Sequence, residues 1–558
     1  MAEIWQLAVQ VAKGRWSSLF ASNMIMIGCG INYLFATYSN YIKSSLGYDQ
    51  ETVNFLGFFK ELGGNFGIVS GLLAELAPPW FSLLIGAAMN FAGYFMIWLA
   101  VTNRIPLPKV WHMCFYIFVA ANAQFFAATC TYVTCLKNFP ECRGVLLGVL
   151  KGFLGLSAAI TTQIYLAIYG NNSSSIIFLI ACFPSALYLI FASAIREDKG
   201  ERQTNELLVF YQFLCVLVVL ALFLLGMIIV QKQVNFSIIE YRVSAIMICV
   251  ILFSPVLIVV REGWVQMNNT RQDPLRLPSD ALIERLTEIA PEEYNPKELK
   301  QKAQRSCFFS TSMCDKPERG EDYTVLQALL SMDMLILLCV TVCGLVTTCT
   351  ATDNLGQIGE SLGYPTKTIS YLVSLVSIWN CFGRIFSGFV SEILLMRYRM
   401  PRPLLWTCVL VLSCVGNLLV AFPFSGSIYI ASVIIGFSLG AQWPLLYAVI
   451  SELFGLKRFA TLLTVVQMAS PLGYYILNVK ITGALYDYEA LKQLTEKGIE
   501  NSSVKELTCL GVLCYRLSFI ILTCTTFVGA LLALILAIRT RQLYEGKIYR
   551  TLNVEDDI

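Results

Sequence analysis

The sequence predicts an all-α polytopic membrane protein, built from two six-helix halves with two additional helices between them. Three observations lead to this fold class. Hydrophobic residues make up 56% of the 558 residues and charged residues only 14%, with a mean hydropathy of +0.65, which is far more apolar than a soluble globular domain. The apolar residues form runs long enough to span a bilayer, and the two halves of the chain share repeated segments.

The apolar runs define the expected helices. A membrane-spanning helix needs roughly 20 apolar residues, and about 14 runs reach this length. They cover residues 17–38, 52–76, 80–102, 111–136, 144–169, 174–195, 207–230, 243–260, 325–350, 368–395, 404–422, 428–450, 459–485 and 513–538.

The order of the runs is six, two and six, with a polar stretch before the last six. The expected units are an N-terminus (1–16), an N-terminal six-helix half (17–195), two additional helices (207–260), a linker (261–323), a C-terminal six-helix half (324–538) and a tail (539–558).

Basic residues predict the orientation of these units. Lys and Arg gather in alternate connections, in the linker and at both ends of the chain, and such residues concentrate in cytoplasmic loops. Both termini and the linker are therefore expected in the cytosol. The first 15 residues form a short polar segment and the first apolar run is long enough to span, so we expect no cleavable signal peptide.

Two ordered matches indicate an internal repeat. The segment 45–48 (SLGY) recurs at 361–364, and 70–75 (SGLLAE) matches 387–392 (SGFVSE) at nearly the same offset. Both matches fall around the second helix of each half. We interpret the chain as a tandem duplication.

Each repeat carries Gly-x-x-x-Glu near the end of its second helix. This pattern resembles the signature of the major facilitator superfamily, in which the glycine permits close helix contact and the acid joins a charge network that latches the cytoplasmic side. Gly71 and Glu75 match in the N-terminal half, although the basic residues that follow in the family are absent. Gly388 and Glu392 match in the C-terminal half.

Nearby basic residues complete the expected cytoplasmic latch. Arg397 stands in the family's basic position, and Arg384 lies one turn before the second glycine. The expected partners of the two acids lie at the turns between helices four and five, and they are Arg143 with Lys137, or Arg458 with Lys457. An ordinary interfacial charge cluster is the alternative reading.

Further segments narrow the resemblance. Residues 15–16 (RW), 38–44 (YSNYIKS), 46–50 (LGYDQ), 138–141 (NFPE) and 353–359 (DNLGQIG) look like the plant nodulin-like branch of that superfamily. The likeness implies a plant source and the major facilitator fold. From the apolar runs we expect a multi-pass protein, located in the plasma membrane or an endomembrane such as the vacuole. The branch is more distantly similar to oxalate/formate and monocarboxylate carriers, which suggests organic anions.

Charged residues inside the spans indicate a solute pathway. Lys60 and Lys151 lie on glycine-rich stripes of the second and fifth helices, at similar depths from opposite faces. Charges at membrane depth usually face the bundle interior. The two lysines could attract a small anion, with Glu61 as proton acceptor or countercharge; alternatively, they bridge neighbouring helices and Glu61 neutralises one of them.

Other polar residues at membrane depth are candidates for the pathway, although such residues also join helices by hydrogen bonds. They are Asn32, Tyr33, Asn65, Gln124, Asn380, Gln442 and Gln467.

Composition disfavours other functions. The chain has one histidine, His112, and its 19 cysteines mostly lie in apolar runs without paired spacing, so they are interpreted as small buried hydrophobes. We therefore expect no metal site, cofactor, catalytic residue, nucleic-acid binding or obligate protein partner. The sequence predicts a secondary transporter for a small polar solute, an organic anion that protons could accompany. The alternative is a non-transporting sensor or scaffold that keeps the fold.

Overall fold

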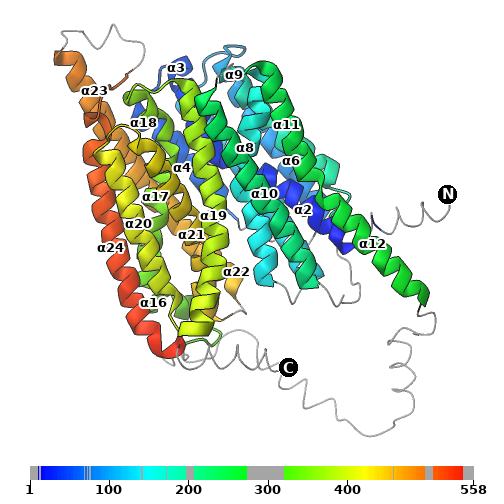
Figure 1. The fold of residues 1–558 in the computed structure, drawn as a ribbon. Coiled ribbons are helices and arrows are strands. Elements are labelled where there is room, and N and C mark those ends of the chain that lie inside the picture. Colours follow the sequence, from blue (N-terminus) through cyan, green and yellow to red (C-terminus); the bar gives the residue numbers. More distant parts are fainter. Residues whose placement is uncertain are drawn as a thin grey trace.

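The computed structural model shows a helical bundle with two halves side by side (Figure 1). It describes residues 11, 14–67, 69–71, 73, 77–139, 143–170, 173–196, 206–234, 236–272, 319–455, 458–496 and 507–544. All regular secondary structure in these residues is helical, as the hydropathy pattern predicts.

The N-terminal half begins with one long, locally distorted helical span. Its elements are α2 (Arg15–Cys29), the 3₁₀ turn η1 (Gly30–Leu34), α3 (Phe35–Leu46), α4 (Gln50–Asn65), α6 (Pro79–Val101), α7 (Val110–Asn138), α8 (Arg143–Tyr169) and α9 (Ser173–Phe191).

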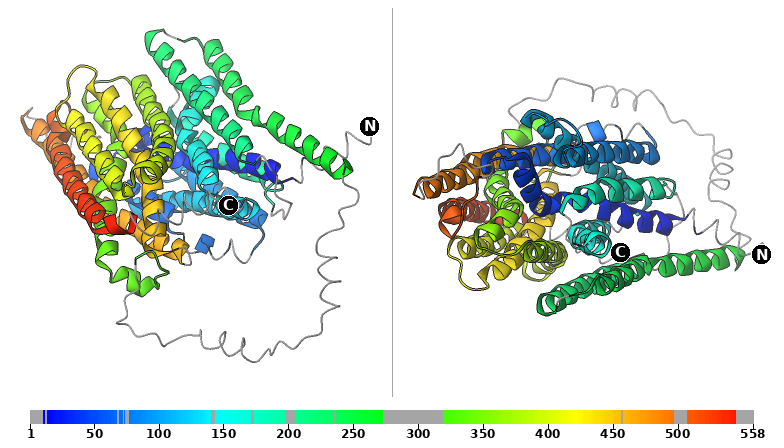
Figure 2. Two further views of the ribbon diagram at one scale, coloured as in Figure 1. Left: turned by 60° about the horizontal axis from the view of Figure 1, so that its bottom comes forward. Right: turned by 90° about the horizontal axis from the view of Figure 1, so that it is seen from above.

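Three helices follow that half and lie on its outside (Figure 2). They are α10 (Glu206–Gln233), α11 (Ile238–Phe253) and α12 (Pro255–Gln272). The first residues of the predicted 261–323 linker are therefore helical, because α12 continues to Gln272. Residues 273–318 of that linker lie outside the described residues.

The C-terminal half contains several interrupted helices. Its elements are α15 (Val325–Leu329), α16 (Met332–Thr341), the π-helical η2 (Val342–Val346), α17 (Thr347–Asp353), α18 (Leu355–Ser361), α19 (Thr366–Tyr398), α20 (Arg402–Ala421), α21 (Ser427–Phe454), α22 (Phe459–Tyr474), the π-helical η3 (Tyr475–Gly483), α23 (Ala484–Glu496) and α24 (Leu513–Leu543).

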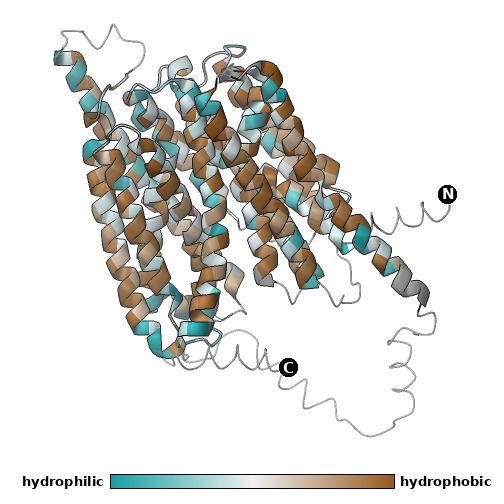
Figure 3. Ribbon diagram, in the orientation of Figure 1, coloured by the Kyte–Doolittle hydropathy of each residue, from teal (hydrophilic) through white to brown (hydrophobic). Residues whose placement is uncertain are grey.

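Twelve helices within the described ranges are long and apolar enough to cross a membrane. Their hydrophobic residues occupy the middle of the bundle and hydrophilic residues gather toward its ends (Figure 3). Two predicted spans fall outside these twelve. The second is α4, which has only 16 residues, and the sixth is α9, whose described apolar part is a shorter helix.

The second predicted span is broken in its middle. A continuous helix over 52–76 was expected, but Phe66 and Gly67 are not helical. Asn122 of α7 donates to the carbonyl oxygens of Gly63 and Phe66, at 2.9 and 2.7 Å. Its amide therefore replaces part of the hydrogen bonding that the break removes, which lipid could not supply.

The repeated segment forms equivalent turns in the two halves. Gly47 ends α3 at φ +68°, and Gly363 follows α18 at φ +79°. Left-handed backbone of this kind is strained for residues with a Cβ. The recurrence of Ser-Leu-Gly-Tyr therefore preserves a turn that depends on glycine.

One end of the bundle is held by hydrogen bonds between the halves. We call the end that carries α23 the outer end, and the opposite end, where α24 finishes, the inner end (Figure 1). The Asp487 carboxylate of α23 accepts the backbone N–H groups of Gln50 and Glu51, at 2.9 and 2.7 Å. It thus caps α4 from the opposite half, where the helix dipole favours an anion.

A disulfide also lies at the outer end. Cys509 and Cys514 are bonded, and the loop between them packs against α18 through the bond from the Gly511 N–H to the Ser361 carbonyl, at 2.8 Å. The interpretation of the cysteines as small hydrophobes did not include this pair. Because disulfides persist in oxidising compartments, the bond agrees with an outer end that faces away from the cytosol.

We predict that an epitope inserted after Glu496, at the end of α23, is reached by antibody from the non-cytosolic face of sealed membranes. A C-terminal tag should be protected in the same preparation. The reasons are the basic-residue asymmetry and the disulfide. The reverse accessibility of the two tags would contradict the orientation.

Candidate functional site

Lys60 joins the two halves deep in the bundle. Its ammonium, on α4, lies 2.7 and 2.6 Å from the carboxylate oxygens of Asp353 on α17 and 3.2 Å from Glu61. The Lys60 and Asp353 side chains are only 3% and 5% exposed. Lys60 thus has one carboxylate partner in each half. This agrees with the alternative interpretation, in which the lysine bridges neighbouring helices and Glu61 neutralises it.

The sequence interpretation did not include Asp353 among the predicted site residues. The Tyr474 hydroxyl, at the end of α22, donates to the same carboxylate that binds Lys60. We call Lys60, Glu61, Asp353 and Tyr474 the cross-half cluster. An acid at the end of the apolar 332–353 helix was the available signal, because such residues are rare within spans.

Amide side chains extend this cluster toward the outer end. The Gln50 amide donates to Asn354 at 3.1 Å, and the Asn354 amide donates to Asn478 at 2.6 Å. Asn54 donates to the Asn478 carbonyl at 2.9 Å. A chain of polar contacts therefore connects α4 with α17 and η3.

Lys151 has a different environment from Lys60. It is buried on α8, and its ammonium lies 3.0 Å from the ring centroid of Tyr447 on α21. This is a cation–π contact. Among the described residues, no carboxylate forms an ion pair with Lys151.

Arg384 lies near Lys151 and has only neutral partners in the described chain. It is buried on α19, where its guanidinium donates to the Tyr33 hydroxyl at 2.8 Å and to the Asn380 side-chain oxygen at 2.7 Å. A Cβ on Gly155, one turn after Lys151, would lie 3.1 Å from Cys381, one turn before Arg384, so the two cations lie on facing turns of α8 and α19. Arg384 thus contacts Tyr33 and Asn380, and Glu392 of the expected cytoplasmic latch is not among its partners in the described residues.

We call the residues around Lys151 and Arg384 the cation cluster. The Gln467 amide donates to the Tyr447 hydroxyl at 3.0 Å. Its members come from both halves and are Tyr33, Lys151, Asn380, Arg384, Tyr447 and Gln467.

The other predicted pathway residues have mixed surroundings. Asn65 donates to the Glu61 carbonyl at 2.8 Å, within one helical turn. Gln442 donates to the Ser438 carbonyl at 3.2 Å and to the Thr348 hydroxyl of α17 at 3.4 Å. Asn32 lies beside Gly64 of α4. Gln124 is buried on α7, and neither of its amide atoms has a hydrogen-bond partner in the described residues.

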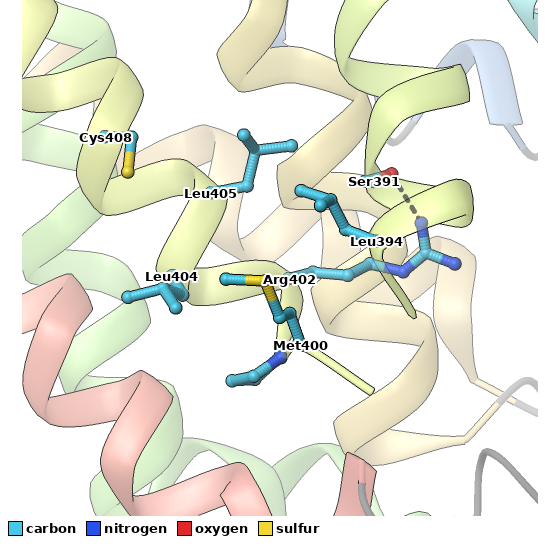
Figure 4. A pocket seen from close by; sticks show the side chains of 8 residues that line it. Ser391, Leu394, Met400, Arg402, Leu404, Leu405 and Cys408 are labelled. Atoms are coloured by element: carbon cyan, nitrogen blue, oxygen red, sulfur yellow. Dashed lines mark hydrogen bonds between the residues drawn. The ribbon is translucent and has the colours of Figure 1, made fainter. Parts of the chain in front are cut away.

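Arg402 organises the inner end of the C-terminal half (Figure 4). Its guanidinium contacts Glu392 at 2.7 Å, Glu452 at 2.6 Å and the Ser391 hydroxyl at 2.6 Å. Tyr544 donates to the other oxygen of Glu452 at 2.7 Å. Glu392 is thus bound by Arg402 at the start of α20, whereas Arg397 and Arg458 are exposed.

Comparisons with known proteins identify the family. The nodulin-like family model matches residues 15–260, and the model of the NFD4 C-terminal domain matches residues 321–545. The two models together cover most of the chain and place it in the nodulin-like family.

Individual relatives agree with this assignment. The nodulin-like chain is 24% identical to Protein NUCLEAR FUSION DEFECTIVE 4 of Arabidopsis thaliana over 547 residues, which are 95% of this chain and 89% of that protein. It is 29% identical to Monocarboxylate transporter 13 of Rattus norvegicus over 131 residues, which are 23% of this chain and 29% of that protein.

A solved transporter has the same fold. The crystal structure of a peptide transporter POT superposes with a TM-score of 0.55 at 13% identity, and the match covers 95% of each chain. The nodulin-like chain is therefore a multi-pass membrane protein with a transporter fold, as its sequence predicts.

The superfamily signature is only partly formed in this nodulin-like protein. A Cβ atom added to Gly71 or Gly388 would meet no described atom within 4 Å. The described residues therefore do not make the close helix contact expected at these glycines. Glu75 and the side chain of Arg143 lie outside the described residues, as does Lys457, so the latch of the N-terminal half stays a prediction.

We predict that Arg402→Leu lowers the thermal midpoint of the purified protein, at a cost of about 3 kcal/mol, because two carboxylates lose their buried cation. Arg397→Leu is the matched control, since Arg397 is exposed near the same connection. Thermal unfolding in detergent measures both effects. Equal losses in the two variants would contradict a specific role for Arg402.

Proposed function

We propose that this nodulin-like protein is a secondary transporter that moves a small organic anion by alternating access, and that the cation cluster binds the anion. The observation that carries this proposal is a pair of buried cations, Lys151 and Arg384, without a carboxylate partner among the described residues. Uncompensated charge in a bundle interior is costly. An anion bound between the two cations would remove that cost.

The cross-half cluster provides the contrast. Lys60 already has Asp353 and Glu61 as partners, so its charge is largely cancelled. The positive potential that we expected from Lys60 and Lys151 is therefore reassigned to Lys151 and Arg384. In this proposal, Lys60 does not bind the anion.

The cation cluster also has the chemistry of a carboxylate site. A guanidinium can bind a carboxylate through two parallel N–H bonds, while the ammonium of Lys151 supplies a compact charge. The hydroxyl groups of Tyr33 and Tyr447 and the amide of Gln467 lie around the two cations. These groups could orient a second polar end of the solute.

The position of the cluster suits alternating access. Lys151 lies in the N-terminal half on α8, and Arg384 lies in the C-terminal half on α19. An anion held by both residues would contact both halves, which is the usual place of the solute in transporters of this kind. The partial likeness to a monocarboxylate transporter supports an anionic solute.

We predict that Lys151→Gln and Arg384→Gln each reduce carboxylate uptake into proteoliposomes by roughly 10- to 100-fold. This range corresponds to one lost charge-assisted hydrogen bond, about 1.5–3 kcal/mol. A panel of labelled mono- and dicarboxylates supplies the probes. Arg384→Lys should recover only part of the uptake, because lysine lacks the planar fork.

Lys232→Gln is the matched control. Lys232 also lies over a tyrosine ring, that of Tyr429 at 3.8 Å, but it is exposed near the outer end, and its loss should leave uptake unchanged. Normal carboxylate uptake in both cation-cluster variants, or transport of cations instead, would refute the proposal. Carboxylate binding with no uptake by the unaltered protein would favour the sensor alternative.

A further inference from the structure

The cross-half cluster holds one more negative than positive charge. Lys60 contributes one positive charge, and Glu61 and Asp353 contribute one negative charge each when both are ionised, so the net charge is −1. The three side chains are 3%, 17% and 5% exposed. A net charge at this depth is unfavourable, and one proton would cancel it.

Few other groups near Asp353 could take that proton. The titratable groups that face its carboxylate are Lys60 and Glu61 of α4, Tyr474 of α22, Tyr38 of α3 and Cys349 of α17. Lysine, tyrosine and cysteine ordinarily release their protons above neutral pH. The two carboxyl groups are therefore the proton acceptors of the cluster.

The two acids differ in what their contacts hold together. Glu61 lies next to Lys60 on α4, so their contact stays within the N-terminal half. Asp353 lies in the C-terminal half and binds Lys60 through both carboxylate oxygens. When the outer ends of the halves separate, the contact between Asp353 and Lys60 must break, whereas the contact between Glu61 and Lys60 can stay.

We propose that Asp353 is the proton-coupling carboxyl of this transporter. The proton binds a carboxylate oxygen of Asp353 and removes the negative charge that holds Lys60, so protonation and closure of the outer end oppose each other. Lys60 keeps Glu61, 3.2 Å away, as its partner, and the net charge of the cluster changes from −1 to 0. This inference rests on the proposed transport function.

The solute site adjoins this proton site. Tyr33 accepts a hydrogen bond from Arg384 of the cation cluster at 2.8 Å, and the preceding residue, Asn32, lies beside Gly64, one turn after Lys60 on α4. A change in the pairing of Lys60 therefore alters the charge that faces the cation cluster. Proton and solute occupancy are linked through this tyrosine.

A distance measurement without solute tests the proposal. Spin labels are introduced through unnatural amino acids at Ser44 of α3 and Tyr488 of α23, which are exposed in opposite halves at the outer end. In the full-length protein in lipid nanodiscs, acidification from about pH 8 to about pH 5 is expected to move the distance distribution toward longer, outer-open values, because protonation acts on a two-state equilibrium.

Asp353→Asn should favour the longer distances at every pH and abolish the response. Glu61→Gln should keep a response but move its midpoint to lower pH, because protonation of Asp353 would then leave Lys60 without a carboxylate partner. Glu51→Gln is the matched control, since it breaks the 2.5 Å cross-half ion pair with Lys480, which is exposed, and it should also keep the response. An unchanged pH response in Asp353→Asn, or its loss in Glu61→Gln, would overturn the assignment to Asp353.

Tyr474→Phe provides a second test if Asp353→Asn does not fold. It retains all three charges and removes one hydrogen bond from the Asp353 carboxylate, so the midpoint of the distance response should move to higher pH. An unchanged midpoint would count against the proposal. Because neither measurement uses a solute, absence of carboxylate uptake would refute the anion site while leaving the proton result to be judged separately.

Discussion

The bilayer imposes the constraint on which this structure depends: a charge within the bundle is costly unless the protein or a bound solute compensates it. Lys60 meets this requirement with an acid from the opposite half, Asp353. The buried charge of Lys60 in the N-terminal half is therefore stabilised by a residue of the C-terminal half. Buried pairs of this kind add little stability compared with apolar packing, but breaking one partner is costly.

The break in α4 is part of the same arrangement. A short helix that ends at Asn65 places Lys60 and Glu61 in its last two turns. Gly63 allows α7 to approach closely, since a Cβ at that position would lie 2.4 Å from the Phe118 carbonyl oxygen. Asn122, on the same face of α7, donates hydrogen bonds to the carbonyl oxygens of Gly63 and Phe66 at the break. Local polar and glycine residues thus stabilise a break that lipid would penalise.

Sequence reasoning predicted the spans and the repeat because both depend on patterns within short segments. It failed where the outcome depends on residues distant in the chain. Arg384 and Glu392 lie on the same 33-residue helix, α19, but the sequence did not show that the first reaches Tyr33 and the second reaches Arg402. Asp353 was visible in the sequence, whereas its partner 293 positions away was not.

The additional helices cover part of the contact between the two halves. Helix α10 contacts both α8 and α19, and Gln231 of α10 forms a reciprocal amide pair with Gln163 of α8 at 2.8 and 3.2 Å. Tyr241 of α11 and Tyr371 of α19 are joined by a hydrogen bond of 3.2 Å. The seam between α8 and α19 is therefore covered by protein rather than by lipid tails. In the proposed transport cycle, movement at this seam breaks these hydrogen bonds between side chains. Its energy cost therefore depends on the amino-acid sequence more than on the lipid composition of the bilayer.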